Sequence, residues 1–185
     1  MDKTKWLRDL PNQLTLFRIA IVPLLLLLFP LDFRPLKLFC AFMFALAAIS
    51  DWLDGFIARR YDSITKLGKI LDPIADKILT AAALVLLTDA QVIYAWVAGL
   101  FLCRELAVSG LRHMAAQQQI EIQVSPLGKW KTFILDVALT CMMVNEPLFG
   151  WPWVEVGMIC LWTSLLISLY SAWEYGTKFW KMVKF

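Results

Sequence analysis

Four aspartates have the residue type and spacing of a divalent-cation site. Asp51 and Asp54 are three residues apart in the stretch DWLDGFIARR, and Asp72 and Asp76 are four residues apart further along. In two helices, these spacings place each pair on one face. Carboxylates that are brought together bind protons or cations, and all-oxygen ligation is typical of Mg²⁺ or Mn²⁺. The pattern therefore predicts a cation site between two neighbouring helices.

Small and basic residues extend the two acidic faces. Gly55 and Ala58 share the stripe of the first pair, Arg59 follows them, and Gly68 lies one turn before Asp72. Without bulky side chains, the helix can contact a flat or extended ligand, and the planar guanidinium of Arg59 matches a phosphate. Close helix packing is the alternative role for the two small residues. Beside four acids and an arginine, we favour a phosphate-bearing ligand.

The chain that must position these residues is strongly apolar. It has 185 residues, 60% of them hydrophobic, and a mean hydropathy of +0.65, which is above the range of soluble domains. Because the connections are short, neighbouring helices must run antiparallel. We predict an all-α fold, a single domain over residues 1–185, with a short interfacial helix over residues 1–13. The six predicted transmembrane helices span residues 14–31, 36–60, 69–90, 92–113, 128–146 and 153–174.

The basic residues predict how this bundle is oriented. With a cytoplasmic N-terminus, 16 of the 18 Lys and Arg residues lie on the cytoplasmic side, and only Arg34 and Lys37 lie outside. The C-terminus is then also cytoplasmic. The first apolar segment has no small-residue cleavage site, so we interpret it as a retained helix.

Several charged residues fall at one depth of the predicted bundle. At about 1.5 Å per residue, they lie roughly 15 to 23 Å below the outer boundary of an apolar layer about 30 Å thick. A single charge at the centre of a membrane costs about 2.5 to 3.5 kcal/mol, so we expect a polar cavity open to the cytoplasm. For Arg104 and Asp136, a structural ion pair between the two side chains is an equal alternative to a place in this cavity. The layer comprises Arg18, Asp51, Asp76, Arg104 and Asp136.

The acidic and small residues together form a motif that resembles a known family. The pattern D-x2-D-G-x2-A-R-x8-G-x3-D-x3-D, which begins at Asp51 and ends at Asp76, fixes eight positions over 26 residues. It matches the signature of the CDP-alcohol phosphotransferases in full. The segments PNQLTLFR, RELAVSGLR and GKWKT are similar to those of family members that use glycerol 3-phosphate. This resemblance implies a six-helix membrane fold, usually homodimeric.

The resemblance also implies roles for individual residues. In this family, the four aspartates hold two divalent metal ions, Mg²⁺ or Mn²⁺, and the last of them, here Asp76, is the proposed general base. The CDP moiety would contact Gly55, Ala58 and Arg59. The metal ligands would be Asp51, Asp54, Asp72 and Asp76.

The implied reaction joins CDP-diacylglycerol to sn-glycerol 3-phosphate, giving phosphatidylglycerophosphate and CMP in phospholipid biosynthesis. This acceptor carries its own phosphate, and a basic cluster at the cytoplasmic ends of two predicted helices is suited to bind it. Ordinary positive-inside anchoring is the alternative. The acceptor-binding candidates are Arg104, Arg112, Lys129 and Lys131, with Arg18 a weaker candidate.

Other functions remain to be compared with this one. A cation-coupled transporter would also place carboxylates in a membrane, but it predicts inverted repeats and a site at the midplane. An intramembrane prenyltransferase lacks the Gly, Ala and Arg positions, and a cardiolipin synthase of the same family would use another acceptor. We expect a multi-pass protein of a bacterial inner membrane with a cytoplasmic active site, membrane lipid as a partner and no nucleic acid.

Overall fold

The computed structural model describes the backbone of residues 3–61, 66–118, 127–145, 147 and 150–183. Side chains are described over the narrower ranges 13–50, 71–118, 130–145, 147 and 150–182. The described backbone is all-helical, which confirms the predicted fold class. The α-helices are α1 (Lys3–Leu28), α2 (Arg34–Tyr61), α3 (Lys66–Asp89), α4 (Ala95–Gln117), α5 (Leu127–Val144) and α6 (Trp153–Val183).

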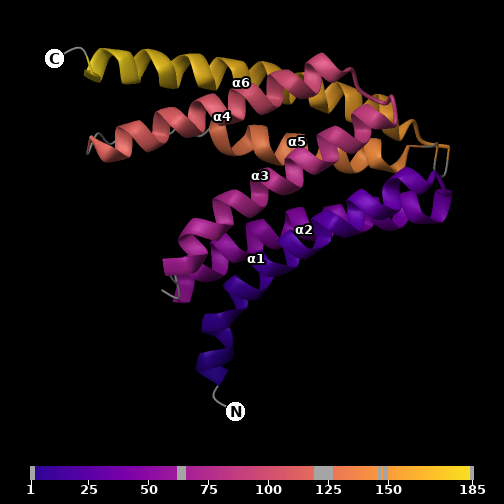
Figure 1. Cartoon of the computed structure of the whole chain (residues 1–185), viewed down its shortest axis with the longest axis horizontal. Helices are drawn as coiled ribbons and strands as arrows, with labels where there is room; N and C mark the ends of the chain where they lie inside the picture. Colours follow the sequence, from indigo (N-terminus) through magenta and orange to yellow (C-terminus); the bar gives the residue numbers. More distant parts are fainter. Residues whose placement is uncertain (1–2, 62–65, 119–126, 146, 148–149, 184–185) are drawn as a thin grey trace.

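The N-terminal helix differs from its prediction. We expected a separate interfacial helix before the first span, but α1 is continuous from Lys3 and ends in the short 3₁₀ helix η1 (Phe29–Leu31). Its N-terminal part turns away from the bundle (Figure 1). Pro11 lies in this part, and a proline inside a helix removes a backbone hydrogen bond and kinks the helix.

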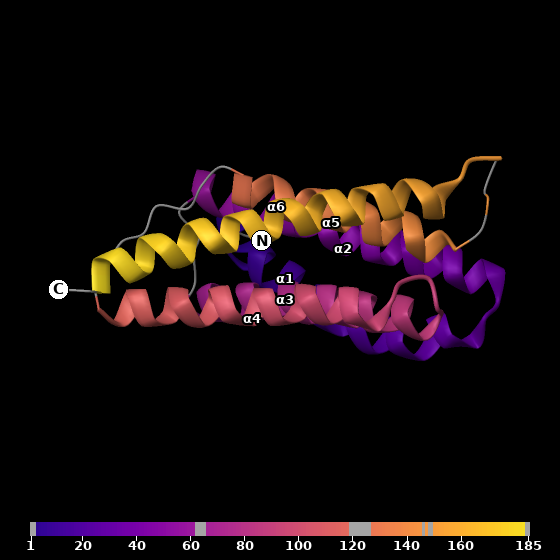
Figure 2. The same cartoon turned by 90° about the horizontal axis from the view of Figure 1, so that it is seen from above.

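The helices form two groups that meet at one end of the molecule. Helices α1, α2 and α3 form one group, α4, α5 and α6 form the other, and the two diverge toward the end that carries both termini (Figure 1). Within the groups, α1 packs against α2 and α3, and α6 packs against α4 and α5. Contacts of α5 with α2 and α3, and of α3 with α4, join the groups. The view from above shows the same long, antiparallel arrangement (Figure 2).

We call the converging end the closed end, and it is formed by the connections α1–α2, α3–α4 and α5–α6. Each connection contains a residue in the left-handed region: Asp32 (φ 51°), Gln91 (φ 57°) and Asn145 (φ 54°). This conformation reverses the chain immediately after a helix. Asp and Asn tolerate it better than other residues with a Cβ atom. The closed end therefore joins the helices by short turns.

The surface and the core of the bundle are both apolar. Buried core residues include Phe44, Leu84, Leu139 and Leu161. Large apolar side chains are also exposed along the helices, among them Leu106, which is 70% exposed. A contiguous exposed apolar surface is typical of a protein that contacts lipid or a partner.

Two of the described helical segments are long and apolar enough to cross a membrane. They are Gln13–Leu31 and Trp153–Met182. The passage of the other helices through a membrane stays a prediction. Membrane insertion of charged helices requires that their polar residues face one another.

Candidate active site

The signature motif occupies two consecutive helices where the chain passes from α2 to α3. Its first five positions, from Asp51 to Arg59, lie in the last part of α2, and the last three lie in α3. Both segments are helical, as the spacing predicted. This passage is at the end opposite the closed end, which we call the open end (Figure 1). Six of the eight signature positions lie outside the residues whose side chains the structure describes: Asp51, Asp54, Gly55, Ala58, Arg59 and Gly68.

Helix α1 supplies two partners to Asp72. The Asp72 Oδ1 atom accepts a hydrogen bond from Thr15 Oγ1 at 3.0 Å and one from Arg18 Nη2 at 2.5 Å. Arg18 is fully buried, whereas the Asp72 side chain is 41% exposed. The buried guanidinium and the hydroxyl therefore fix the direction of a carboxylate that still reaches solvent. Both donors use the same oxygen, so the other carboxylate oxygen is compatible with cation binding.

Pro73 follows Asp72 and lies inside α3. The helix begins earlier than predicted, at Lys66. A proline in this position cannot donate a backbone hydrogen bond and its ring displaces the carbonyl one turn earlier. The helix therefore lacks one backbone hydrogen bond beside Asp72, one of the predicted metal ligands.

A cavity of about 330 Å³ lies between α3, α4, α5 and α6. Toward the closed end its walls are apolar, with Leu84, Phe101 and Leu135. Toward the open end they are polar. The cavity is thus amphipathic along its length, as a ligand with a charged head and an apolar body requires. The polar lining consists of Asp76, Lys77, Thr80, Glu105, Lys131, Thr132, Ser164 and Ser168.

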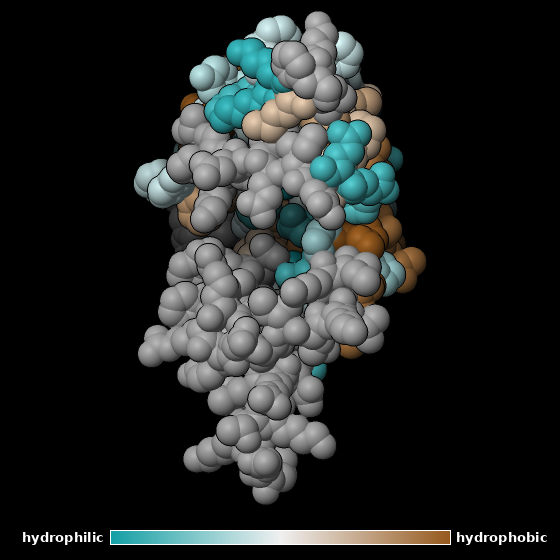
Figure 3. All heavy atoms as spheres, turned by 90° about the vertical axis from the view of Figure 1, so that its left-hand side faces the viewer, coloured by the Kyte–Doolittle hydropathy of each residue, from teal (hydrophilic) through white to brown (hydrophobic). Residues whose placement is uncertain are grey.

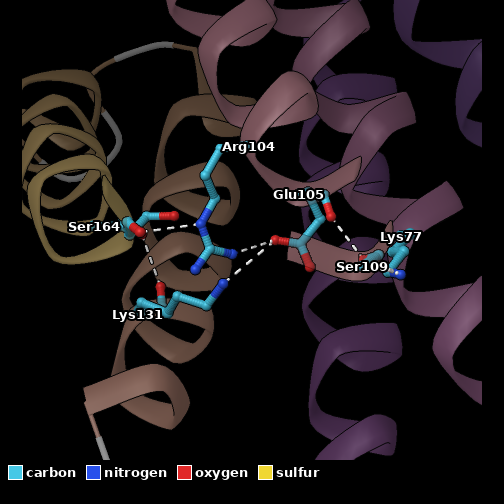
Figure 4. Close-up of polar contacts among 7 residues, drawn as sticks. Lys77, Arg104, Glu105, Ser109, Lys131 and Ser164 are labelled. Carbon is cyan, nitrogen blue, oxygen red and sulfur yellow. Dashed lines mark hydrogen bonds and ion pairs between the residues drawn. The ribbon is translucent and has the colours of Figure 1, made fainter. Parts of the chain in front are cut away.

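Two basic side chains meet one carboxylate on the wall of this cavity (Figure 4). Glu105 Oε2 accepts hydrogen bonds from Arg104 Nη1 at 2.8 Å and from Lys131 Nζ at 3.3 Å. Helix α6 contacts both residues: Arg104 Nε donates to the Ser168 carbonyl at 3.0 Å, and the Ser164 hydroxyl donates to the backbone carbonyl of Lys131 at 2.8 Å. We call Arg104, Glu105 and Lys131 the charged triad.

A third cation approaches the other side of Glu105. Lys77 Nζ donates to Ser109 Oγ at 2.5 Å, and the Ser109 hydroxyl donates to the Glu105 carbonyl at 2.7 Å (Figure 4). Lys77 immediately follows Asp76, so this contact couples α3 to α4 beside the predicted general base. Polar contacts therefore cross from α3 through α4 to α5 and α6.

The structure separates the predicted acceptor-binding residues. Arg104 and Lys131 belong to the charged triad. Arg112 lies over the ring of Tyr175, with its guanidinium carbon 5.8 Å from the ring centroid, and Arg18 contacts Asp72. The Lys129 side chain lies outside the described residues. The contacts of the four described residues thus divide among three locations.

Asp136 lies apart from the charged triad. It lines a second cavity, of about 440 Å³, together with Ala45 and Ile49 of α2 and Thr140 of α5. The partners of Arg104 are instead Glu105 and Ser168. The structure therefore does not pair Arg104 with Asp136, and the two residues of the predicted layer have different surroundings.

Sequence reasoning missed Glu105, Lys77 and Thr15. Glu105 is adjacent to Arg104, and adjacent helical residues project about 100° apart, so their contact could not be expected from spacing. Lys77 was one of many basic residues counted toward orientation. Thr15 lies three residues before Arg18, on the same helical face, and this spacing is a signal that could have linked them.

Only two of the four predicted metal ligands, Asp72 and Asp76, have described side chains. The described side chains contain no group of three or more Asp, Glu, His or Cys residues arranged to hold a metal ion. Asp72 and Asp76 are one helical turn apart on α3, and Asp76 lines the cavity. Two carboxylates on one helical face fit part of a hard-cation site, because such ions take carboxylate and water oxygens.

The open end gives these groups a route to solvent. Figure 3 views that end, where hydrophilic side chains are visible inside a hollow between the two helical groups. The exposed fraction of the Asp72 side chain, 41%, agrees with such access. A charged ligand would therefore reach the cavity without crossing the apolar core.

Comparison with known proteins decides the family. The family model described as CDP-alcohol phosphatidyltransferase matches residues 8–170. The chain belongs to this family. A relative from Bacillus subtilis is 34% identical over 95% of this chain and 97% of its own. A relative from Rickettsia typhi is 35% identical over 91% of this chain and 96% of its own. A relative from Salmonella choleraesuis is 36% identical over 90% of this chain and 92% of its own.

All three of these relatives are named CDP-diacylglycerol–glycerol-3-phosphate 3-phosphatidyltransferase. The family resemblance drawn from the signature motif is confirmed. In this phosphatidyltransferase family member, the signature lies at the open end, next to the amphipathic cavity and the charged triad.

Proposed function

We propose that this protein transfers the phosphatidyl group of CDP-diacylglycerol to sn-glycerol 3-phosphate, with release of CMP. Family membership and the names of the relatives support the reaction class and both substrates. The observation that carries the proposal is that Asp76, the last carboxylate of the signature, and Lys131 line the same cavity. A carboxylate and an ammonium in one amphipathic cavity suit an anionic acceptor and a lipid donor.

The cavity suggests how the two substrates are arranged. Its apolar part, which includes Phe101 and Leu135, suits the start of the acyl chains, and its polar part suits the diphosphate and the acceptor. Lys131 and Arg104 would bind the acceptor phosphate, because cations beside a cavity stabilise a dianion. We keep Arg112, Lys129 and Arg18 as further acceptor candidates.

The chemical step follows from this arrangement. The hydroxyl oxygen of glycerol 3-phosphate forms a bond to the β-phosphorus of CDP-diacylglycerol while the bond from that phosphorus to the CMP oxygen breaks. The Asp76 carboxylate accepts the hydroxyl proton, and CMP leaves with the bonding electrons. Arg59 would bind the phosphates of CDP, with Gly55 and Ala58 beside it.

We propose Asp51, Asp54, Asp72 and Asp76 as ligands of two divalent ions, Mg²⁺ or Mn²⁺. Bound there, the ions would neutralise charge on the diphosphate and on the leaving CMP. The contacts from Thr15 and Arg18 to Asp72 support this role, since they orient a carboxylate at the open end. Such orientation of a ligand from behind is a common requirement of metal sites.

We further propose that all six α-helices cross a bacterial inner membrane with the open end cytoplasmic, and that the protein is a homodimer. The 16 Lys and Arg residues expected on one side support the orientation. The exposed apolar side chains along the bundle support contact with lipid or with a second copy.

An acceptor panel tests the proposed reaction. The full chain is purified in detergent and supplied with CDP-diacylglycerol, Mn²⁺ or Mg²⁺, and one of four acceptors: glycerol 3-phosphate, serine, inositol phosphate or phosphatidylglycerol. CMP and the lipid product are both measured. We expect turnover with glycerol 3-phosphate alone. Turnover with another acceptor and none with glycerol 3-phosphate would overturn the substrate assignment, and turnover with none would overturn the reaction.

A further inference from the structure

Glu105 brings two cations together that would otherwise repel one another. Its Oε2 atom contacts Arg104 Nη1 at 2.8 Å and Lys131 Nζ at 3.3 Å. The Arg104 and Lys131 side chains are 4% and 10% exposed, whereas the Glu105 side chain is 41% exposed. Glu105 and Lys131 both line the cavity, and the two cations have little contact with water.

The charges of this triad leave one positive charge in excess. Two nearly buried cations side by side repel each other more strongly than in water, and a shared carboxylate offsets this repulsion. With Glu105 in place, Arg104 and Lys131 can both stay charged and close together. The surplus charge faces the cavity that Lys131 and Glu105 line.

Contacts from α6 restrict where these cations can move. The Ser168 carbonyl accepts from Arg104 Nε, and the Ser164 hydroxyl donates to the Lys131 carbonyl. Arg104 is thereby held between α4 and α6, while the backbone of Lys131 is held to α6. The side chain of Lys131 keeps rotational freedom, and its contact with Glu105 limits that freedom. Groups held in place before a ligand arrives bind it with a smaller loss of entropy.

We propose that Glu105 is a positioning residue for the acceptor: it holds Arg104 and Lys131 as a paired dication at the cavity wall, ready for an anionic acceptor. This inference rests on the proposed function. Glu105 acts through the two cations and makes no contact with the phosphate itself. Its removal should weaken acceptor binding and leave donor binding intact.

The test compares substrate dependence in Glu105→Gln and in the unchanged chain. The full-length protein in detergent is assayed for CMP release while glycerol 3-phosphate and CDP-diacylglycerol are varied in turn. We expect the KM for glycerol 3-phosphate to rise about tenfold or more, because contacts to charged groups change binding by that order. We expect the KM for CDP-diacylglycerol to stay within about twofold and kcat within about threefold.

Two results would overturn the proposal. One is an unchanged KM for glycerol 3-phosphate in Glu105→Gln. The other is an equal rise in both KM values, which indicates a general structural effect. If Glu105→Gln does not fold, Glu105→Asp decides the question. Its shorter side chain keeps the charge but withdraws from Lys131, so it should raise the same KM by a smaller factor, and an unchanged value would contradict the proposal.

A double-variant cycle tests whether Glu105 acts through Lys131. Lys131→Gln alone should raise the KM for glycerol 3-phosphate. In the Lys131→Gln background, Glu105→Gln should have a smaller effect than in the unchanged chain, because one of its two partners is already neutral. If the double variant raises the KM for glycerol 3-phosphate by the product of the two single-variant factors, Glu105 acts independently of Lys131. That result would refute the mechanism.

Glu174→Gln is the matched control. Glu174 also accepts from a lysine, Lys178, at 2.6 Å, but this pair lies on α6 away from the cavity and both side chains reach solvent. The control should leave both KM values unchanged. The unchanged chain separates the two proposals. If it releases no CMP with glycerol 3-phosphate, the proposed function fails. If it is active and Glu105→Gln leaves the KM for glycerol 3-phosphate unchanged, only the role of Glu105 is refuted.

Discussion

Arg18 connects the first helix to the signature motif at the level of single residues. It is among the largest fully buried side chains, and its charge is balanced by Asp72 on α3. The sequence placed Arg18 in a layer of charge and considered it for the acceptor phosphate. In the structure, Arg18 contacts a predicted metal ligand, Asp72. We therefore expect its main effect to be on the stability and orientation of that carboxylate.

Replacing Arg18 by Met should destabilise the protein measurably. Met fills much of the same volume but leaves Asp72 without its charged donor, at a cost of roughly 1.5 to 3 kcal/mol. Thr15→Val removes the neutral donor to the same oxygen and should cost about 1 kcal/mol. Thermal unfolding in detergent measures both. A Thr15→Val variant that is less stable than Arg18→Met would contradict this ranking.

At the residue scale, the sequence predicted which residues belong to the candidate site better than it predicted which residues they contact. The signature motif could be read directly, because its eight positions follow helical spacing. The partner of Arg104 could not, because Glu105 is its neighbour in sequence and Ser168 contributes a backbone carbonyl. Backbone acceptors carry no sequence signal. Contacts between helices also depend on helix rotation, which hydrophobic pattern determines only approximately.

At the scale of elements, α5 and α6 approach closely at Gly157. A Cβ atom at this position would lie 2.5 Å from Met142 Cγ and 2.9 Å from the Ala138 carbonyl oxygen. The second contact is with backbone, which cannot move aside without shifting a helix. Gly157 therefore permits the close packing of these two helices, as small residues do in membrane proteins.

Gly157→Ala should destabilise the bundle by about 1 to 3 kcal/mol, the usual cost of overpacking. Gly176→Ala is the matched control on the same helix, because a Cβ atom there meets nothing within 4 Å. The control should be neutral or stabilise α6 slightly, since Ala favours helix over Gly. Unfolding midpoints in detergent measure both variants. Equal destabilisation of the two variants would contradict the assignment of the effect to the close contact at Gly157.

The six helices were predicted close to their observed positions, but several of their ends were not. We expected the last helix to end at residue 174, where charged residues begin, yet α6 continues to Val183. Buried Tyr175 and Phe179 continue its packed face, and Glu174 pairs with Lys178 one turn later. Hydrophobicity alone marks an apolar segment and does not mark where an amphipathic helix stops.

At the scale of the whole molecule, the two ends of the bundle differ in polarity and in packing. The closed end has short turns and an apolar core, and the open end carries the signature motif and the termini (Figure 1). Arg34 and Lys37 were the two basic residues predicted on the outer side. Lys37 forms an ion pair with Asp32 at the start of α2. This pairing reduces the conflict between a lysine at that end and the predicted orientation.

The arrangement of the two helical groups could not be predicted from the sequence. Short connections predicted antiparallel neighbours, and the described helices follow this prediction. The divergence of the groups at the open end depends on contacts of α5 with α2 and α3, which are distant in sequence. The predicted polar cavity depends on that divergence, and its amphipathic lining became evident only once Asp76, Phe101 and Lys131 were located together.

Dependence of CMP release on a divalent ion tests the central claim most directly. The full chain, supplied with CDP-diacylglycerol and glycerol 3-phosphate, is assayed with Mn²⁺, after chelation, and after Mn²⁺ is restored. We predict loss and recovery of activity in the unchanged chain, at least about a hundredfold lower activity in Asp76→Asn, and near-normal activity in Asp89→Asn, which alters an exposed carboxylate at the closed end of the same helix. Undiminished CMP release in the presence of chelator, or from Asp76→Asn, would contradict the account.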